Sequence, residues 1–348
     1  MTFSKKILHW YSENKRSLPW RATTDPYCIW LSEIMLQQTR VAQGTPYYIK
    51  FIKQFPTVYD LANASEEEVL KLWQGLGYYS RARNLHATAK IIAEKYQGQF
   101  PKTYEELIAL KGVGDYTASA IASIAFNQAH AVVDGNVYRV LSRVFGITTP
   151  INESKGIKEF KLLAQTLLHI EDPGTYNQAL MEFGALVCTP KKPKCDSCIF
   201  NDSCYALQKK AIDTLPVKLK RLKVKKRYFN YLVVDNNGES TIIKQRLHKD
   251  IWMNLFEFPL YETKQILEDE SELESVIFRD LMIEGTYSIK KYNEFPIQHK
   301  LTHQTLYASF WIVKPKGTVK NLVAWEDLKQ IALPVLLQNF VDKYQSLN

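Results

Sequence analysis

The sequence contains no apolar run that approaches the ~18 residues required by a membrane-spanning helix. Its first residues, MTFSKKILHWY, carry charges and aromatic side chains every few positions and lack the apolar stretch of a secretory signal. The chain also has no internal repeat and no low-complexity tract. These absences argue against a membrane, secreted or repeat protein. We therefore expect a cytoplasmic protein with no membrane partner.

Cysteine is scarce, and its distribution is uneven. Four of the five cysteines, Cys188, Cys195, Cys198 and Cys204, form a C-x6-C-x2-C-x5-C pattern, while Cys28 stands alone among apolar residues. In a cytoplasmic chain such a group indicates metal binding rather than disulfides. Zinc accepts four thiolates, but its sites usually pair two CxxC units and only one is present. The unequal loops favour the corners of a cuboidal 4Fe–4S cluster, with zinc as the alternative.

The length of 348 residues suits two domains. Residues 1–208 carry helix-start signals, in which a capping residue precedes an apolar run. These signals are Asp25 before Pro26, Ser65 with Glu68, and Thr103 with Glu106. Between Lys209 and Arg227, nine Lys and Arg residues face one acid. Residues 209–227 are therefore interpreted as a basic linker, or as a solvated connector with no ligand.

Beyond the linker, the hydrophobic period changes from helical to strand-like. Tyr228–Val234 and Thr241–Lys244 are predicted strands joined by a hairpin turn, and Leu306–Val313 is a third strand. Residues 270–284 and 325–332 are predicted to be helical. The segment 228–348 is therefore expected to be an α+β domain that follows an all-α domain.

A glycine-rich turn, Lys111-Gly112-Val113-Gly114, lies between two predicted helices, 103–110 and 115–126. Such a turn can aim backbone amides and a helix N-terminus at an anion. The net charge of +9 also favours a polyanionic partner. The turn is therefore either a helix–hairpin–helix phosphate clamp or a simple connection between helices.

Two acids occupy positions that suit glycosidic hydrolysis, which needs one protonated and one ionised carboxyl group. Glu33 interrupts the apolar run Ile29–Leu36, where burial should raise its pKa. Asp134 precedes the predicted helix Val137–Phe145, whose positive end can keep it ionised. The alternatives are a carboxylate on a helix edge for Glu33 and a simple N-cap for Asp134.

Together these motifs resemble the MutY family of DNA glycosylases, and the match spans nearly the whole chain. The segments that carry the resemblance are 18–21 (LPWR), 32–40 (SEIMLQQTR), 75–81 (GLGYYSR), the hairpin with Tyr116, 133–137 (VDGNV) and the four cysteines. The resemblance implies an all-α helix–hairpin–helix glycosylase domain with a 4Fe–4S loop, followed by an α+β Nudix-like domain. Lys111 departs from the proline common in this hairpin.

The resemblance also implies roles for single residues. Glu33 protonates adenine N7 and later handles the water, Asp134 stabilises the cationic sugar, and Tyr116 and Asn136 position these groups. Residues implied to contact DNA are Arg21, Gln38, Leu76, Tyr78, and the hairpin Lys111, Gly112, Val113 and Gly114. Gln38, Leu76 and Tyr78 are expected to wedge into the duplex while adenine flips out.

Residues 228–348 resemble a Nudix-type fold, notably at Trp252–Pro259. No glutamate-rich helix follows, so the domain is expected to read 8-oxoguanine rather than to hydrolyse nucleotides. The reading residues are Thr302 and His303, at a position that resembles a Phe-Ser-His segment of the family. A threonine hydroxyl can pair with the N7–H that oxidation creates. Alternatively, the two residues merely begin a strand.

The expected function is thus monofunctional excision of adenine opposite 8-oxoguanine or guanine by a monomer acting on chromosomal duplex DNA. A bifunctional lyase of the endonuclease III kind would need a lysine at Tyr116, because a phenol cannot form an imine. A mismatch thymine glycosylase would lack the large second domain. A non-catalytic DNA scaffold is opposed only by the positions of Glu33 and Asp134.

Overall fold

The computed structural model describes residues 1–219, 224–274, 277, 281, 283 and 285–347. The chain divides into two compact units. The first comprises Met1–Asn63 and Asn84–Lys220, and the second comprises Ala64–Arg83 and Arg221–Asn348. Residues 64–83 therefore group with the C-terminal part of the chain, a pairing that the sequence did not predict.

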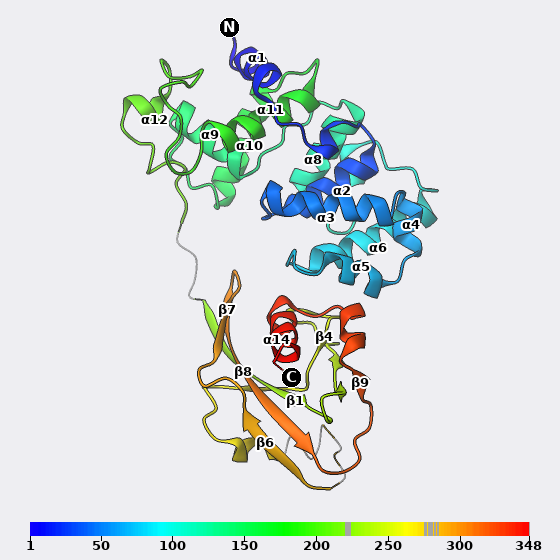
Figure 1. Cartoon of the computed structure of the whole chain (residues 1–348). Helices are drawn as coiled ribbons and strands as arrows, with labels where there is room; N and C mark the ends of the chain where they lie inside the picture. Colours follow the sequence, from blue (N-terminus) through cyan, green and yellow to red (C-terminus); the bar gives the residue numbers. More distant parts are fainter. Residues whose placement is uncertain (220–223, 275–276, 278–280, 282, 284, 348) are drawn as a thin grey trace. The chain divides into compact units, whose positions relative to one another are not determined.

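The first unit is helical, as expected (Figure 1). Its helices are α1 (Phe3–Asn14), η1 (Pro19–Arg21), α2 (Pro26–Leu36), α3 (Val41–Gln54), α4 (Val58–Asn63), α7 (Tyr104–Ile108), α8 (Asp115–Phe126), α9 (Gly135–Phe145), α10 (Ser154–Leu167), α11 (Pro173–Leu186) and α12 (Tyr205–Gln208), together with most of α6 (Ser80–Lys95). Asp25 caps α2 by accepting a hydrogen bond from the Tyr27 amide at 3.0 Å. The predicted capping boxes at Ser65 and Thr103 are both confirmed.

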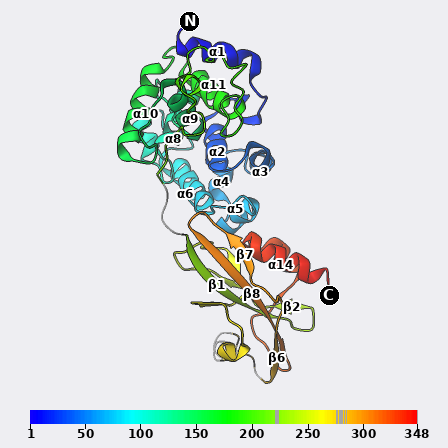
Figure 2. The same ribbon diagram turned by 90° about the vertical axis from the view of Figure 1, so that its left-hand side faces the viewer.

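Helices α1, α9 and α11 pack around one apolar core (Figure 2). Its fully buried members include Phe160, Tyr176 and Phe183. Leu215 is only 4% exposed within the same core. The first part of the predicted linker is thus packed against the helices, while its residues 220–223 lie outside the described part of the chain. A second set of contacts joins α2 to α8, which brings Glu33 and Tyr116 to one place.

The second unit is built on a five-stranded sheet in the order β5-β1-β8-β6, with β7 also paired to β8. These strands are β1 (Lys225–Val234), β5 (Leu260–Thr263), β6 (Tyr287–Lys291), β7 (Ile297–Lys300) and β8 (Gln304–Pro315). Strands β1 and β8 run parallel, and the other pairs are antiparallel. Two short pairs flank the sheet, β2 (Ser240–Thr241) with β9 (Val323–Ala324), and β3 (Lys244–Gln245) with β4 (Phe256–Glu257). The unit is α+β, as predicted.

Helix α14 (Val335–Gln345) covers one face of this sheet, where the rings of Phe310 and Phe340 stack at 3.9 Å. The other face holds a separate apolar cluster that includes Leu273 and Trp311. Of the predicted helix 270–284, the first residues form a 3-10 turn, η2 (Glu270–Leu273), and the described residues 274, 277 and 281 are helical. Residues 275, 276, 278–280, 282 and 284 lie outside the described part of the chain. The predicted helix 325–332 is a 3-10 helix, η3 (Glu326–Gln330).

The sequence predicted that β1 pairs with the strand that follows the turn after it, and this pairing is wrong. The turn itself forms, with Asn237 and Gly238 at positive φ. However, only an isolated bridge joins Asn236 to Ser240. Strand β1 pairs with β8 along its whole length and with β5 at Tyr228–Tyr231, and β2 pairs with β9 rather than with β1.

Residues 64–83 belong to the second unit through side-chain contacts. Helix α5 (Glu66–Trp73) donates from Lys71 Nζ to the Ile331 carbonyl at 2.9 Å. Gln74 Nε2 donates to Gln338 Oε1 at 2.8 Å.

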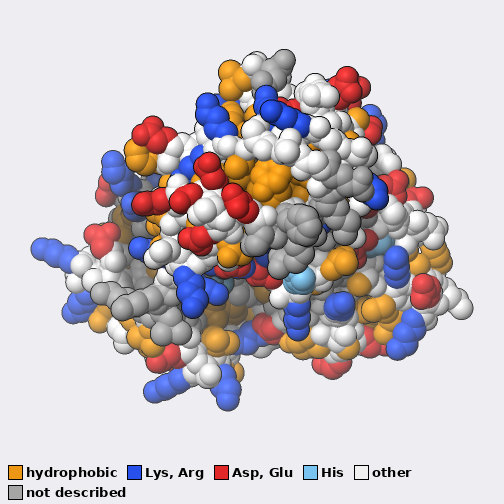
Figure 3. Space-filling view, turned by 90° about the horizontal axis from the view of Figure 1, so that it is seen from below, with side chains coloured by type: hydrophobic (Ala, Val, Ile, Leu, Met, Phe, Trp, Pro, Cys, Tyr) orange, Lys and Arg blue, Asp and Glu red, His pale blue; other side chains and the backbone are white. Residues whose placement is uncertain are grey.

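Within the described residues, no helix is long and apolar enough to cross a membrane. On the face drawn in Figure 3, Lys and Arg side chains are interspersed with acidic ones.

Candidate active site

Glu33 lies on the buried face of α2 and is 7% exposed. The Tyr116 hydroxyl, on α8, donates a hydrogen bond of 2.5 Å to Glu33 Oε2. Burial raises the pKa of Glu33 to about 7, and this effect outweighs the opposing hydrogen bond from Tyr116. Burial, together with the nearby Glu33 and Asp134, raises the pKa of Tyr116 well above its ordinary value. Tyr116 therefore remains a donor, and Glu33 can exchange a proton near neutral pH.

Asp134 is the N-cap of α9, where its side chain accepts hydrogen bonds from three donors. The donors are the backbone amides of Asn136 (2.9 Å) and Val137 (2.8 Å) and the Asn136 side-chain amide (2.7 Å). Burial raises the pKa of Asp134, and these hydrogen bonds oppose that shift because they favour the ionised form. Asn136 is itself held by Arg139, which donates to Asn136 Oδ1 at 2.7 Å. Asp134 therefore caps helix α9 and also lines the same cavity as Glu33.

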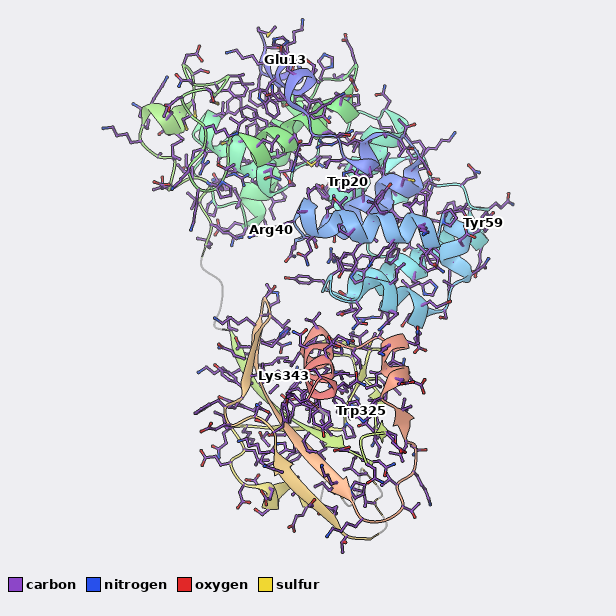
Figure 4. All side chains as sticks on the ribbon, viewed as in Figure 1. Glu13, Trp20, Arg40, Tyr59, Trp325 and Lys343 are labelled. Carbon is purple, nitrogen blue, oxygen red and sulfur yellow. The ribbon has the colours of Figure 1, made fainter. Side chains whose placement is uncertain are left out.

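These groups line one cavity, here called the carboxylate pocket, whose walls include Glu33, Tyr116, Asp134 and Asn136. The pocket brings together the four residues predicted for catalysis. Trp20, labelled in Figure 4, forms part of its wall and packs edge-on against Tyr48 of α3, with ring centroids 5.3 Å apart. The cavity therefore has an apolar side and a carboxyl-bearing side, as a site for a flipped base requires.

The sequence reasoning missed a third acid in the carboxylate pocket. The side chain of Glu182, on α11, is 1% exposed and is clamped by Arg16 and Arg21. Arg16 donates at 2.7 and 2.6 Å, and Arg21 at 3.0 and 2.9 Å. Burial alone would raise the pKa of Glu182, but hydrogen bonds from the two arginines hold it at about 2. Its position in the apolar run LMEFGAL is the same signal that singled out Glu33.

Arg21, predicted to contact DNA, therefore lies in the wall of the carboxylate pocket with its guanidinium bonded to Glu182. Gln38, another predicted DNA contact, is exposed at the end of α2 and has a φ of 57°. Leu76 and Tyr78 lie in the second unit, where Leu76 is buried and Tyr78 is 44% exposed. The carboxylate pocket thus contains only the first of these four residues.

The glycine-rich turn connects α7 to α8, as predicted. Gly112 has a φ of 78°, and a Cβ there would lie 2.6 Å from the Asn84 side chain, so only glycine fits. Lys111 and Gly114 are exposed, whereas Val113 is buried. Gly114 is the N-cap of α8 and has no side chain to cap the first turn. The turn therefore presents an uncapped helix N-terminus, which suits a phosphate group.

Asp115 follows this turn, where an unpaired acid would repel phosphate. The Lys161 ammonium lies 3.0 Å from both Asp115 carboxylate oxygens, and the Tyr104 hydroxyl donates to the same carboxylate at 2.6 Å. The charge of Asp115 is thereby paired with a cation of the chain itself, at the protein surface. Lys161 also donates to Ser119 and to the Ala131 carbonyl, so it ties α8 to the segment before Asp134.

The four clustered cysteines line one cavity and form no disulfide. Among the described residues, no three His, Cys, Asp or Glu side chains lie close enough to hold a single metal ion. The four thiols line the same cavity, and as thiolates they would be the ligands of a 4Fe–4S cluster. The Phe200 amide lies 3.5 Å from Cys198 Sγ and can stabilise a thiolate there.

Arg143 holds this loop in place, and the sequence reasoning missed it. Its side chain, 2% exposed, donates to the carbonyls of Thr189 (2.7 Å) and Pro190 (3.2 Å). It also lies 3.5 Å from Cys188 Sγ. No local pattern marks Arg143, because its partners are distant in the sequence. Cys188, for example, lies 45 positions away. Lys191, Lys192 and Lys194 are exposed on the first cysteine loop.

Thr302 and His303 lie in the second unit, in the turn between β7 and β8, and both are exposed. They line a cavity, here called the loop pocket, formed by residues 76–80 with Arg83, residues 250–252 and residues 300–304. The hydroxyl groups of Tyr78 and Thr302 are hydrogen-bonded to each other. The loop pocket thus brings together Leu76, Tyr78, Thr302 and His303, which the sequence placed in two separate groups.

Comparison with known families assigns each part of the chain. Residues 31–165 match the HhH-GPD superfamily base excision DNA repair protein family, and residues 230–343 match the NUDIX domain. Residues 188–204 match the iron-sulfur binding domain of endonuclease III. This last match covers all four clustered cysteines. It indicates a 4Fe–4S cluster and favours it over the zinc alternative.

Solved structures show the same helical fold. A thermostable thymine-DNA glycosylase is 33% identical, with a TM-score of 0.56 over 60% of this chain and 95% of that chain. Endonuclease III in a non-covalent DNA complex is 22% identical, with a TM-score of 0.52 over 60% of this chain and 94% of that chain. At that identity, the second similarity supports the fold alone.

Among curated proteins, the human adenine DNA glycosylase is 47% identical over 216 residues, or 60% of this chain and 40% of the human one. The adenine DNA glycosylase of Buchnera aphidicola subsp. Schizaphis graminum (strain Sg) is 35% identical over 352 residues, which cover 99% of both chains. A relative that matches from end to end, across the helical and the Nudix-like parts, shows that the chain belongs to the adenine DNA glycosylase family.

Proposed function

We propose that this enzyme flips adenine out of duplex DNA where it is mispaired with 8-oxoguanine or guanine, and hydrolyses its N-glycosidic bond to initiate base excision repair. The observation that carries the proposal is the buried Glu33–Tyr116 hydrogen bond of 2.5 Å, in the same pocket as Asp134. Because its pKa lies at about 7, Glu33 can be protonated when the base enters and can accept a proton afterwards.

In the first step, the Glu33 carboxyl group gives its proton to adenine N7. The bond between N9 and the sugar C1′ then breaks, and its electron pair leaves with the base. The positive charge that develops on the sugar lies toward the Asp134 carboxylate, whose three hydrogen-bond donors favour its ionised form against the effect of burial. In the second step, water adds to C1′ and its proton passes to the Glu33 carboxylate.

Glu182 and its two arginines give the carboxylate pocket a means of selecting adenine. The exocyclic amino group of adenine is a donor, and N1 is an acceptor. The pocket wall carries acceptors on Glu182 and Gln178 and a donor on Arg21. A base that presents the reverse pattern would place donor against donor or acceptor against acceptor at this wall, so its own polar groups would lack partners, which costs on the order of 1–3 kcal/mol for each group.

The enzyme is proposed to be monofunctional because the residue that bonds to Glu33 is a tyrosine. A phenol cannot form the imine that strand cleavage by a lyase requires. Supporting contacts to DNA are proposed for the uncapped N-terminus of α8, and for Gln38, Lys111 and the lysines of the cysteine loop. We further propose that Cys188, Cys195, Cys198 and Cys204 are the cluster ligands, and that a monomer acts on chromosomal DNA.

Preference for 8-oxoguanine is assigned to the loop pocket. Thr302 carries a hydroxyl that both donates and accepts, and it is hydrogen-bonded to the Tyr78 hydroxyl. Oxidation gives guanine an N7–H donor, which this hydroxyl can accept, and the His303 amide provides a second donor for the new carbonyl. Undamaged guanine lacks the N7–H and would lose that match.

The test is a single-turnover assay that scores adenine release and strand cleavage separately, on duplexes with adenine opposite 8-oxoguanine, guanine or cytosine. We expect release opposite 8-oxoguanine and guanine, slow release opposite cytosine, and an intact strand until alkali is added. Borohydride trapping of a protein–DNA adduct at the turnover rate would contradict the monofunctional mechanism. Absence of base release from every duplex would instead favour a DNA scaffold without activity.

A further inference from the structure

A charged cluster lies behind the loop pocket and consists of Arg227, Arg246, Asp250, Glu257 and Glu262. Both guanidinium groups are almost buried, with side-chain exposures of 8% for Arg227 and 6% for Arg246. The ring of Phe229 lies beneath both cations, 4.7 Å from Arg227 and 5.7 Å from Arg246. A network in which each almost buried guanidinium group is bonded to two carboxylates has few alternative arrangements, so it fixes the segments that it bonds.

Asp250 is the member that joins the two arginines. Arg227 lies 3.0 Å from Asp250 Oδ1 and 2.8 Å from Asp250 Oδ2. Arg246 donates to Asp250 Oδ2 at 2.5 Å. Each arginine also has a carboxylate of its own, Glu262 for Arg227 at 2.6 Å and Glu257 for Arg246 at 2.7 Å. Asp250 is therefore the only carboxylate of this cluster that both arginines share.

The two arginines lead to different walls of the loop pocket. Arg227 Nη1 donates to Gln304 Oε1 at 3.4 Å, in the segment that carries Thr302 and His303. Arg246 Nε donates to the Ile251 carbonyl at 2.9 Å, in the part of the wall formed by residues 250–252. Asp250 itself lines the pocket. Through Asp250, the position of one wall is tied to that of the other.

We propose that Asp250 is a positioning residue that sets the distance between the two walls of the loop pocket and thereby the preference for 8-oxoguanine over guanine. The inference rests on the proposed function, in which Thr302 and His303 read the base opposite adenine. Asp250 acts through Arg227 and Arg246 and needs no contact with the base. It differs in this respect from Thr302, whose hydroxyl is the reading group.

Asp250→Asn is the informative substitution because it keeps the shape of the side chain and removes its charge. Arg227 retains Glu262 and Arg246 retains Glu257, so no buried guanidinium is left without a carboxylate. Glu262→Gln is the matched control. It also removes one carboxylate from Arg227, but Glu262 is not part of the loop pocket and bonds to only one of the two arginines.

The measurement is the ratio of single-turnover adenine-release rates opposite 8-oxoguanine and opposite guanine, with thermal unfolding recorded for each variant. We expect Asp250→Asn to lower the ratio roughly tenfold, since small misplacements of binding groups carry costs of this order or larger. The rate opposite guanine should fall by much less than the rate opposite 8-oxoguanine, and Glu262→Gln should keep the wild-type ratio. If the role of Asp250 were merely structural, Asp250→Asn would lower the unfolding temperature or lower both adenine-release rates by the same factor. The ratio of the two rates would then stay unchanged.

If Asp250→Asn fails to fold, Gln304→Leu provides the same test, because it breaks only the bond between Arg227 and the reading segment. An unchanged ratio in a folded Asp250→Asn or Gln304→Leu protein would overturn the inference. A fall of equal size in Glu262→Gln would also overturn it.

The combined variant Thr302→Ala, His303→Ala separates the positioning role of Asp250 from the reading role of Thr302 and His303. If the double variant keeps its preference for 8-oxoguanine, the proposed reading role of Thr302 and His303 is wrong. If the double variant loses this preference while Asp250→Asn keeps it, only the positioning role of Asp250 is wrong.

Discussion

The two pockets of this enzyme contain acids whose pKa values are shifted in opposite directions, buried Glu33 and half-buried Asp250. In the carboxylate pocket, burial brings the pKa of Glu33 to about 7, with a tyrosine hydroxyl as its hydrogen-bond partner. In the wall of the loop pocket, burial is outweighed by hydrogen bonds from Arg227, the Ile251 amide and Arg246, so the pKa of Asp250 falls to about 2. The first acid can change its protonation state during a reaction, whereas the second stays ionised and holds neighbouring segments in place.

The comparison predicts its largest effect at Glu33. Glu33→Gln keeps the size and hydrogen-bonding capacity of the side chain but cannot deliver a proton. We expect adenine release to fall roughly 10²–10⁴-fold or below detection on every duplex, because general acid catalysis contributes about this much. DNA binding and thermal unfolding should remain near wild type. Near-normal single-turnover release by this variant would remove Glu33 from the mechanism.

Loss of the iron–sulfur cluster, which is held outside both pockets, should weaken the binding of all DNA substrates alike. Purified protein should be brown and contain about four irons per chain, as a 4Fe–4S cluster requires. Cys198→Ser should lose the cluster and, with it, affinity for duplexes that carry either 8-oxoguanine or guanine, because the cysteine loop bears three exposed lysines. Iron analysis and binding titrations measure both effects. Stoichiometric zinc in protein prepared without oxygen, or full DNA affinity without the cluster, would contradict this account.

The smallest effect is expected at the loop pocket and should be confined to one substrate. The double variant Thr302→Ala, His303→Ala should release adenine opposite guanine at the wild-type rate and lose the advantage opposite 8-oxoguanine. The loss corresponds to on the order of 1–3 kcal/mol, the cost of leaving a buried polar group unpaired. Parallel single-turnover rates on the two duplexes measure it. An equal fall on both duplexes would mean that the loop binds DNA without reading the base.

Local patterns in the sequence were sufficient for much of the active site. The acid in an apolar run, the N-cap aspartate and the glycine turn are each marked by residues a few positions away, and the structure has Glu33, Asp134 and Gly112 in the expected local settings. The family resemblance supplied Tyr116 and Asn136, which no local pattern singles out. Predicted helix starts at Asp25, Ser65 and Thr103 were confirmed for the same reason, since capping depends on neighbours in the chain.

The features that the sequence did not reveal depend on distant partners. Glu182 pairs with Arg16 across 166 positions, so neither residue carries a local sign of the other. The turn at Asn237 and Gly238 was predictable, but β1 pairs with β5 and β8 rather than with the strand that follows the turn. The grouping of residues 64–83 with the C-terminal unit likewise arises from side-chain contacts that only the folded chain creates.

The most direct test of the difference between the two acids is the pH dependence of single-turnover adenine release opposite 8-oxoguanine. Because Glu33 must be protonated to activate the base, the rate should be highest below pH 7 and fall as pH rises through its pKa of about 7. The Tyr116 hydrogen bond lowers that pKa, so Tyr116→Phe should shift the descending limb to higher pH. A profile that is flat from roughly pH 5 to 9, or one that rises through neutrality, would contradict the role of Glu33 as the acid.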